Sequence, residues 1–160
     1  MSKNGFVEKN PRARRVKIMV FGTFDGLHKG HFNFFKQAKK LSKNPFLVVS
    51  IARDKNVYKI KGATSILNEK KRFALVNSSK LVDRVVLSGI KNHLPHILKE
   101  KPDIIALGYD QKAYVKNLKK DLKNKGFNVK VVRMQPYKEK IYKNKLLKMK
   151  SSLDVSFSDG

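Results

Sequence analysis

The chain has 160 residues, a length that suits one domain with a single hydrophobic core. It contains no cysteine, which excludes disulfides, thiolate metal sites and cysteine nucleophiles. No window of about 18 uninterrupted apolar residues is present, which excludes a transmembrane helix, and the first 15 residues lack the apolar segment of a signal peptide. We therefore expect a cytoplasmic protein with no membrane partner.

The formal net charge is +25, from 37 basic and 12 acidic residues, and it would attract nucleotides, nucleic acid or anionic lipid. Nearly half of this excess lies in residues 112–150, where 13 Lys and one Arg face two acidic residues, a net charge of +12. The lysines are nevertheless scattered over every predicted element, and aromatic residues do not alternate with them as in a single-strand stacking platform. Both a general surface bias and a polyanionic partner stay open.

Hydrophobic patterning predicts alternating strands and helices in a domain of residues 16–150, between a basic flexible arm (1–15) and a flexible tail (151–160). The predicted elements are, in order, a strand over 16–21, a helix over 29–43, a strand over 46–52, a loop to 62, a helix after the cap Asn68 to about 79, a strand over 84–87, a helix over 93–100, a strand over 103–107, a helix over 111–125 closed by Gly126, and a strand over 127–132.

This alternation predicts the α/β class, a doubly wound parallel sheet of five strands with helices on both faces and right-handed crossovers. Ligands of such sheets bind outside the carboxyl ends of the strands, where the strand order reverses. Loops that follow strands are therefore the places where a site is expected.

The loop after the first strand has the features of a phosphate site. Gly22 lets the chain turn sharply beside a ligand, Thr23 offers a hydroxyl and an amide, and the amino end of the next helix points at the same space. His28 and His31 are three residues apart, so both imidazoles lie on one helix face, which Gly30 keeps open. They can donate hydrogen bonds to phosphate oxygens and stabilise the charge that grows as pyrophosphate departs.

Each histidine alone could equally be a capping or packed residue. An i, i+3 pair without a nearby third ligand makes a poor zinc site, and no metal ligands are predicted in the protein. The combination of a strand, Gly22-Thr23-Phe24-Asp25 and His28-Lys29-Gly30-His31 is more specific than its parts.

This segment resembles the signature of the cytidylyltransferase-like nucleotidyltransferase superfamily, whose HxGH motif matches residues 28–31. The resemblance covers about residues 16–148. It implies a Rossmann-like fold with strand order 3-2-1-4-5 and transfer of a nucleotidyl group from ATP or CTP to a phosphate or alcohol, with release of pyrophosphate. That order would make the loops at Gly22 and Gly108 face one crevice.

Two further loops gain a role from the same resemblance. Lys59 and Lys61, after the second strand, match phosphate-binding lysines of similar enzymes, and Arg72 matches an arginine position that we interpret as phosphate-binding rather than as a surface ion pair. After the fourth strand, Gly108 permits close approach of a ligand, and Asp110 could accept hydrogen bonds from ribose hydroxyls or an amino group.

The pairing of an Ala-Arg-Asp-x-Asn-Val segment at 52–57 with Leu-Gly-Tyr-Asp-Gln at 107–111 resembles the archaeal-type FAD synthase branch, which adenylylates FMN. One motif departs from the superfamily: the usual Ser/Thr-rich segment after the fifth strand is missing, and the first Ser or Thr is Ser151. Asn144 or Lys143 would stand in its place, since an amide or ammonium can still donate to phosphate.

The leading hypothesis is thus an adenylyltransferase that uses ATP, Mg²⁺ or another divalent cation, and a phosphate-bearing acceptor such as FMN. The alternatives are a CTP-dependent cytidylyltransferase acting on a polyol or amino-alcohol phosphate, and a weakly active relative that binds nucleic acid; a homodimer is compatible with each. The expected catalytic residues are His28, His31 and Lys61, and the expected nucleotide-binding residues are Gly22, Thr23, Phe24, Asp25, Gly30, Lys59, Arg72, Gly108, Asp110 and Asn144. Asp25 is also a candidate for a metal or acceptor contact.

Overall fold

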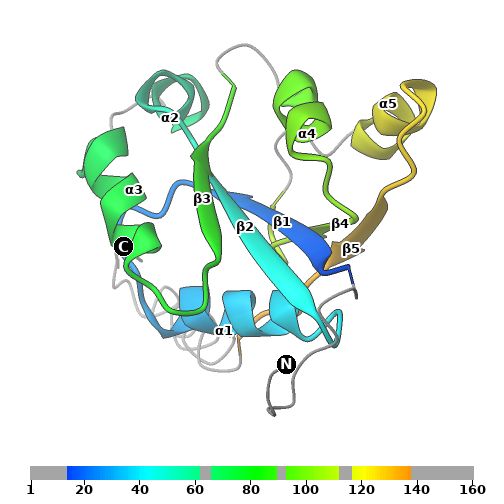
Figure 1. Cartoon of the computed structure of the whole chain (residues 1–160). Coiled ribbons are helices and arrows are strands. Elements are labelled where there is room, and N and C mark those ends of the chain that lie inside the picture. Colours follow the sequence, from blue (N-terminus) through cyan, green and yellow to red (C-terminus); the bar gives the residue numbers. More distant parts are fainter. Residues whose placement is uncertain (1–13, 62–65, 90–92, 112–116, 138–160) are drawn as a thin grey trace, which may run out of the picture.

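Five parallel strands and the helices that join them make up the part of the chain that the computed structural model describes, residues 14–61, 66–89, 93–111 and 117–137, with the backbone alone for 59–61 (Figure 1). The elements are β1 (Val16–Gly22), α1 (Lys29–Lys39), β2 (Pro45–Ile51), α2 (Asp54–Lys61), α3 (Glu69–Asn77), β3 (Arg84–Leu87), α4 (Leu94–Glu100), β4 (Ile104–Leu107), α5 (Leu118–Asn124) and β5 (Lys130–Arg133).

The strand order is β3-β2-β1-β4-β5, and every neighbouring pair is parallel. The predicted doubly wound sheet and its order are therefore confirmed. β1 pairs with β2 over its whole length, from Val16 opposite Pro45 to Gly22 opposite Ile51. Both strands are mostly apolar, interrupted by Lys17 in β1 and Ser50 in β2, as expected for strands that helices cover on both faces. Strand order reverses at β1, between β2 and β4, so a crevice is expected at their carboxyl ends.

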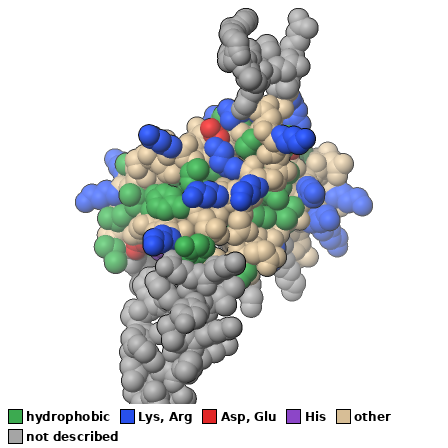
Figure 2. All heavy atoms as spheres, turned by 90° about the horizontal axis from the view of Figure 1, so that it is seen from below, with side chains coloured by type: hydrophobic (Ala, Val, Ile, Leu, Met, Phe, Trp, Pro, Cys, Tyr) green, Lys and Arg blue, Asp and Glu red, His purple; other side chains and the backbone are tan. Residues whose placement is uncertain are grey.

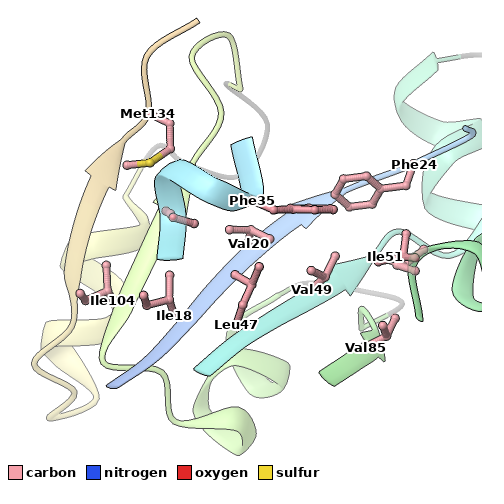
Figure 3. Close-up of a cluster of buried hydrophobic side chains, with 13 residues drawn as sticks. Ile18, Val20, Phe24, Phe35, Leu47, Val49, Ile51, Val85, Ile104 and Met134 are labelled. Atoms are coloured by element: carbon pink, nitrogen blue, oxygen red, sulfur yellow. The ribbon is translucent and has the colours of Figure 1, made fainter. Parts of the chain in front are cut away.

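Alternate residues of β1 point into two separate cores. Ile18 and Val20 pack with Phe35 of α1 and Val76 of α3 on one face (Figure 3). Met19 and Phe21 pack on the other face, with Ile97 of α4 and with Leu118 and Leu122 of α5. The sheet alternation thus assigns α1 and α3 to one layer and α4 and α5 to the other.

The segment after β2 is a helix, where the sequence predicted a loop. Within α2, Val57 is buried and Tyr58 is exposed, and the side chains of residues 59–61 lie outside the described residues. Its amino terminus is satisfied from a distance: the Asp54 N–H donates to Glu69 Oε1, at 3.0 Å, fifteen residues further along the chain. A local cap could not have indicated the start of this helix, because the acceptor of the Asp54 N–H lies on another helix.

Two other helices have shorter bounds than the sequence predicted. α1 ends at Lys39 rather than residue 43, and Gln111 lies in the loop after β4 rather than in a helix. Gly126 closes α5, as predicted, two residues after its last helical residue. Its positive φ of 78° is a conformation that glycine adopts more easily than other residues. The Gly126 N–H donates to Lys123 O and the Phe127 N–H to Leu122 O, the pattern of a Schellman motif. The last strand begins at Lys130, three residues later than predicted.

The end of the predicted arm is attached to the domain. Arg14 forms a two-pronged ion pair with Asp103, and Arg15 lies over the Phe46 ring, with 4.9 Å from its guanidinium carbon to the ring centroid. The rest of the predicted arm and the tail lie outside the described residues. No helix in the described part is long and apolar enough to cross a bilayer.

Positive side chains are distributed over the face that lies below the view of Figure 1. Figure 2 shows Lys and Arg spread across this surface among apolar groups, with few acidic side chains between them. On the other layer, α5 exposes Lys119, Lys120 and Lys123. The described lysines therefore give a broad positive surface rather than one confined patch.

A buried histidine at the start of α4 predicts acid sensitivity. Burial, together with neighbouring His96, lowers the pKa of His93 from 6.5 to about 4. Between these two pH values His93 is protonated in the unfolded chain and neutral in the folded chain. Its neutral form therefore does not reduce the free energy of unfolding above pH 6.5, and this free energy falls as the pH is lowered toward 4. The free energy of unfolding should decrease between pH 7 and pH 4.5 by about 2 kcal/mol less in His93→Leu than in the parent chain. Urea unfolding at the two pH values measures this difference. Parallel losses in both proteins would contradict this assignment.

Candidate active site

The loops after β1 and β4 meet where the strand order reverses, and one side chain joins them. Gln111 Nε2 donates to the Phe21 carbonyl of β1 at 3.3 Å, while its Oε1 accepts the Gly108 N–H at 3.2 Å. Arg133, at the end of β5, donates from Nη1 to the carbonyls of Gly108 and Gln111, at 2.8 Å each. The predicted proximity of the Gly22 and Gly108 loops is thus confirmed. Gln111 and Arg133 were not predicted to shape this edge of the sheet.

The two histidines of the HxGH segment cap α1. His28 is the N-cap residue, and its Nδ1 accepts the Gly30 N–H at 3.0 Å. His31 reaches back, and its Nδ1 accepts the His28 N–H at 3.2 Å. This is a capping box made by imidazoles in place of the usual hydroxyl and carboxylate. The rings lie nearly stacked, with centroids 3.9 Å apart and 30° between their planes.

This arrangement fixes which ring nitrogen can donate. Because Nδ1 of each imidazole accepts a backbone N–H, a neutral ring at either position carries its proton on Nε2. Two Nε2–H groups and the positive end of the α1 helix dipole then belong to one small region, which suits an anion. The capping and phosphate-binding interpretations of the histidines are therefore compatible, since each function uses a different nitrogen.

Gly30 is required by the position of the His28 ring. A Cβ added at residue 30 would lie 2.9 Å from His28 Cε1 and 3.1 Å from its Nδ1, so the ring would have to leave its cap position. This contact explains the glycine between the two histidines in terms of ring placement.

We expect Gly30→Ala to separate stability from activity. Alanine favours the helix by about 0.5–1 kcal/mol relative to glycine, while loss of the His28 cap costs about as much, so the midpoint of thermal unfolding should change little. Turnover should fall at least about tenfold because the imidazole is displaced. Thermal unfolding and pyrophosphate release measured on the same preparation check both parts, and unchanged turnover would refute the proposed ring placement.

Gly22 and Phe24 form a tight turn at the end of β1. A Cβ at residue 22 would lie 2.6 Å from the Phe24 ring, which leaves no room for any side chain. Phe24 has a φ of 56°, and its ring packs against Phe35 (Figure 3). It also contacts the His31 ring edge-on. Phe24 is 5% exposed, so the predicted nucleotide contact of this residue could be made through its backbone and not through its ring.

Asp25 holds a second segment against this turn. Its Oδ2 accepts the Ile66 N–H at 2.6 Å and its Oδ1 the Leu67 N–H at 2.7 Å. Both carboxylate oxygens are thus engaged by the chain that leads into α3. In this structure Asp25 connects the loop after β1 to the segment before α3. The sequence predicted a metal or acceptor contact for this carboxylate instead. Among the residues with described side chains, no three His, Asp or Glu form a group that could hold a metal ion.

Arg72 is buried inside the protein, whereas the sequence predicted that its side chain would contact phosphate. Its side chain is fully buried, and its guanidinium donates to three carbonyls and one carboxylate of the protein. A phosphate contact, which was our prediction, would need an exposed guanidinium edge. The structure instead makes Arg72 a connector between the loops of the site, and neither of our two sequence interpretations included that role.

Asp54 and Glu69 complete this connection. The Asp54 N–H donates to Glu69 Oε1, and the Glu69 N–H donates to Asp54 Oδ2, so the first residues of α2 and α3 cap each other. Asp54 also accepts Arg72 Nη2 at 2.6 Å. Burial alone would raise the pKa of Asp54, but the hydrogen bonds from Arg72 and from the Glu69 backbone prevail and lower it. The carboxylate therefore remains charged at neutral pH.

The remaining predicted residues divide into three groups. Thr23 lies in the β1 turn, and its carbonyl accepts Arg72 Nη1. Asp110 is exposed, and a Cβ at Gly108 would meet no atom closer than 3.8 Å, so that loop leaves space beside the crevice. Lys59 and Lys61 lie within α2, but their side chains, like the whole of Asn144, are outside the described residues, and their roles stay predictions.

Comparison with known proteins agrees with this geometry. A model of the cytidylyltransferase-like family matches residues 19–157. The chain is 45% identical over 119 residues to a FAD synthase of Korarchaeum cryptofilum, which covers 74% of this chain and 80% of the relative. It is 39% identical over 141 residues to a FAD synthase of Archaeoglobus profundus, which covers 88% of each.

Among solved structures, the chain resembles a lipopolysaccharide core biosynthesis protein from Thermoplasma volcanium, with 38% identity and a TM-score of 0.70 over 76% of this chain and 98% of that one. The family match spans most of the domain and includes the HxGH segment whose geometry is described above. The chain belongs to the cytidylyltransferase-like nucleotidyltransferase family.

Proposed function

We propose that this protein is an FMN adenylyltransferase, which transfers AMP from ATP to FMN and forms FAD and pyrophosphate. The observation that carries the proposal is the pair of imidazoles that cap α1 at the point where the strand order reverses. The choice of FMN as acceptor is supported by relatives that are named FAD synthase and are 39–45% identical over most of their length.

The chemistry requires positioning and charge stabilisation rather than a covalent intermediate. A phosphate oxygen of FMN attacks the α-phosphorus of ATP in line, a new P–O bond forms, and the bond to the β-phosphate oxygen breaks. The Nε2–H groups of His28 and His31 donate to the α-phosphate and to the leaving oxygen as negative charge grows there. The positive end of the α1 dipole favours the same anionic region, and Lys59 and Lys61 are proposed to neutralise the outer phosphates.

A divalent cation fits this site as part of the substrate. Mg²⁺ retains several waters and is commonly held by substrate phosphates with one or two carboxylates, so a dedicated protein cage is not needed. Asp110, which is exposed in the loop after β4, is a described carboxylate that could approach it. When bound, the cation would neutralise charge on the triphosphate.

The test is identification of the product. The purified chain is incubated with Mg²⁺ and either ATP or CTP, with FMN or glycerol 3-phosphate as acceptor, and products are identified by mass spectrometry. We expect FAD and pyrophosphate from ATP with FMN. Cytidylyl transfer without any ATP reaction would replace the proposal with a cytidylyltransferase. Salt-dependent binding to RNA without turnover of any nucleotide would favour the nucleic-acid-binding alternative.

A further inference from the structure

One buried cation joins the four chain segments that surround the β1 turn. Arg72, at 0% exposure, donates from Nη1 to the Thr23 carbonyl at 2.9 Å and to the Ala52 carbonyl at 2.7 Å. Its Nε donates to the Leu67 carbonyl at 3.0 Å, and its Nη2 to Asp54 Oδ1 at 2.6 Å. The planar guanidinium thereby connects the loop after β1, the end of β2, the start of α2 and the entry to α3.

Asp25 closes this network into a ring. The segment that accepts from Arg72 at Leu67 O also donates its Leu67 N–H to Asp25 Oδ1. The β1 turn is therefore held at two points, at Thr23 by Arg72 and at Asp25 by the chain before α3. A turn fixed at both ends keeps its amide directions constant, which is what pre-organised anion binding requires.

The peptide between Thr23 and Phe24 connects Arg72 to the turn after β1. This peptide is trans, so its C=O and N–H point in opposite directions. Arg72 binds the carbonyl end, and the Phe24 N–H therefore points away from the guanidinium. A cation on the carbonyl polarises the amide and makes its N–H a stronger donor. Phe24 has a positive φ and a ring that is buried in the core, so the backbone of this turn has little freedom to move.

A purely stabilising role explains this arrangement poorly. The Arg72–Asp54 ion pair joins a fully buried guanidinium to a carboxylate side chain that is 41% exposed, so the cost of desolvating Arg72 offsets much of the attraction. The charge of Arg72 is also neutralised by Asp54 at close range, so long-range attraction of a triphosphate cannot be its main contribution. What the guanidinium supplies is the simultaneous placement of four acceptors in one plane, which a point-charge ammonium cannot reproduce.

We propose that Arg72 is a positioning residue for the nucleotide phosphates, acting through the Thr23–Phe24 peptide and the start of α2 without touching the ligand. The inference rests on the proposed function for the identity of the nucleotide. It assigns to Arg72 a role that differs from a direct phosphate contact, and it makes Asp25 the second support of the same turn.

The test compares nucleotide affinity with stability. Arg72→Lys keeps the charge, Arg72→Met keeps much of the volume, and Val76→Ala, a buried substitution on α3 outside the network, is the matched control for lost stability. Binding of Mg-ATP and of Mg-CTP is titrated calorimetrically without FMN, at a temperature about 10 °C below the unfolding midpoint of the least stable variant.

We expect both Arg72 variants to bind the preferred nucleotide about 10–30-fold more weakly, and Val76→Ala to bind it within about twofold of the parent chain despite a lower midpoint. Parent-like affinity in Arg72→Lys would overturn the inference, as would equal weakening in Val76→Ala. If neither Arg72 variant folds, Asp25→Asn, which disturbs the other support of the turn, must show the weakening, and parent-like affinity there refutes the inference.

The two proposals fail separately. Nucleotide binding that depends on Arg72, without formation of FAD, would refute FMN adenylylation and leave the positioning role intact. If the parent chain forms FAD and the Arg72 variants bind the nucleotide as tightly as it does, FMN adenylylation would stand and the positioning role of Arg72 would be refuted. A parent chain that binds neither nucleotide would refute both.

Discussion

Replacing His28 with asparagine is expected to lower turnover about 10²–10³-fold while leaving the fold and its thermal stability nearly unchanged. Asparagine is among the best N-cap residues, so its Oδ1 can accept the Gly30 N–H that His28 Nδ1 accepts now. It lacks, however, the Nε2–H that we assign to the phosphate. Steady-state pyrophosphate release and thermal unfolding, measured side by side, check the two halves of this expectation.

The matched variant is His28→Ala, which removes both the cap and the donor. It should lose as much turnover as asparagine and in addition about 1 kcal/mol of stability, a decrease of about 2–4 °C in the unfolding midpoint. If asparagine restored turnover to that of the parent chain, His28 would be a capping residue only. If both variants unfolded at the same temperature, the cap would contribute nothing measurable.

Gly22→Ala is expected to destabilise the protein by about 2–3 kcal/mol. The new methyl group would lie 2.6 Å from the Phe24 ring, which is fixed between His31 and Phe35 and cannot withdraw without opening the core. Because the same ring orients the turn, nucleotide affinity should fall together with stability. Urea unfolding and calorimetric titration with Mg-ATP measure the two effects.

Gly26 provides the control for this substitution within the same loop. An added Cβ there would meet no atom within 4 Å, and its φ is outside the range that disfavours other residues. We therefore expect Gly26→Ala to change the free energy of unfolding by less than about 0.5 kcal/mol. A loss at Gly22 no larger than the loss at Gly26 would show that the turn yields easily, which contradicts the tight packing described for Phe24.

Features of this molecule that depend on neighbours in sequence were predictable. The apolar runs of β1 and β2, the Asn68 cap of α3 and the Gly126 end of α5 are local patterns, and the structure confirms each of them. The strand order came from the resemblance carried by residues 22–31 and is confirmed as well. The HxGH segment indicated a phosphate site because its spacing is itself short-range.

Features that depend on contacts across the fold were not predictable. α2 is capped by Glu69 from another helix, and the burial of Arg72 follows from acceptors at residues 23, 52, 54 and 67. A sequence shows a cationic side chain but not how many carbonyls converge on it, so exposure was the natural assumption for Arg72. Asp25 was similarly taken for a ligand contact, because its backbone partners lie 41 and 42 residues away.

The reciprocal caps of α2 and α3 also bear on how this part of the molecule can open. Each first N–H finds its acceptor on the carboxylate of the other helix, Asp54 for α3 and Glu69 for α2. Unwinding the first turn of one helix therefore leaves the first N–H of the other without this acceptor, while Asn68 still accepts the Lys71 N–H of α3. The first turns of α2 and α3 should thus unfold locally together, as one cooperative unit beside the β1 turn.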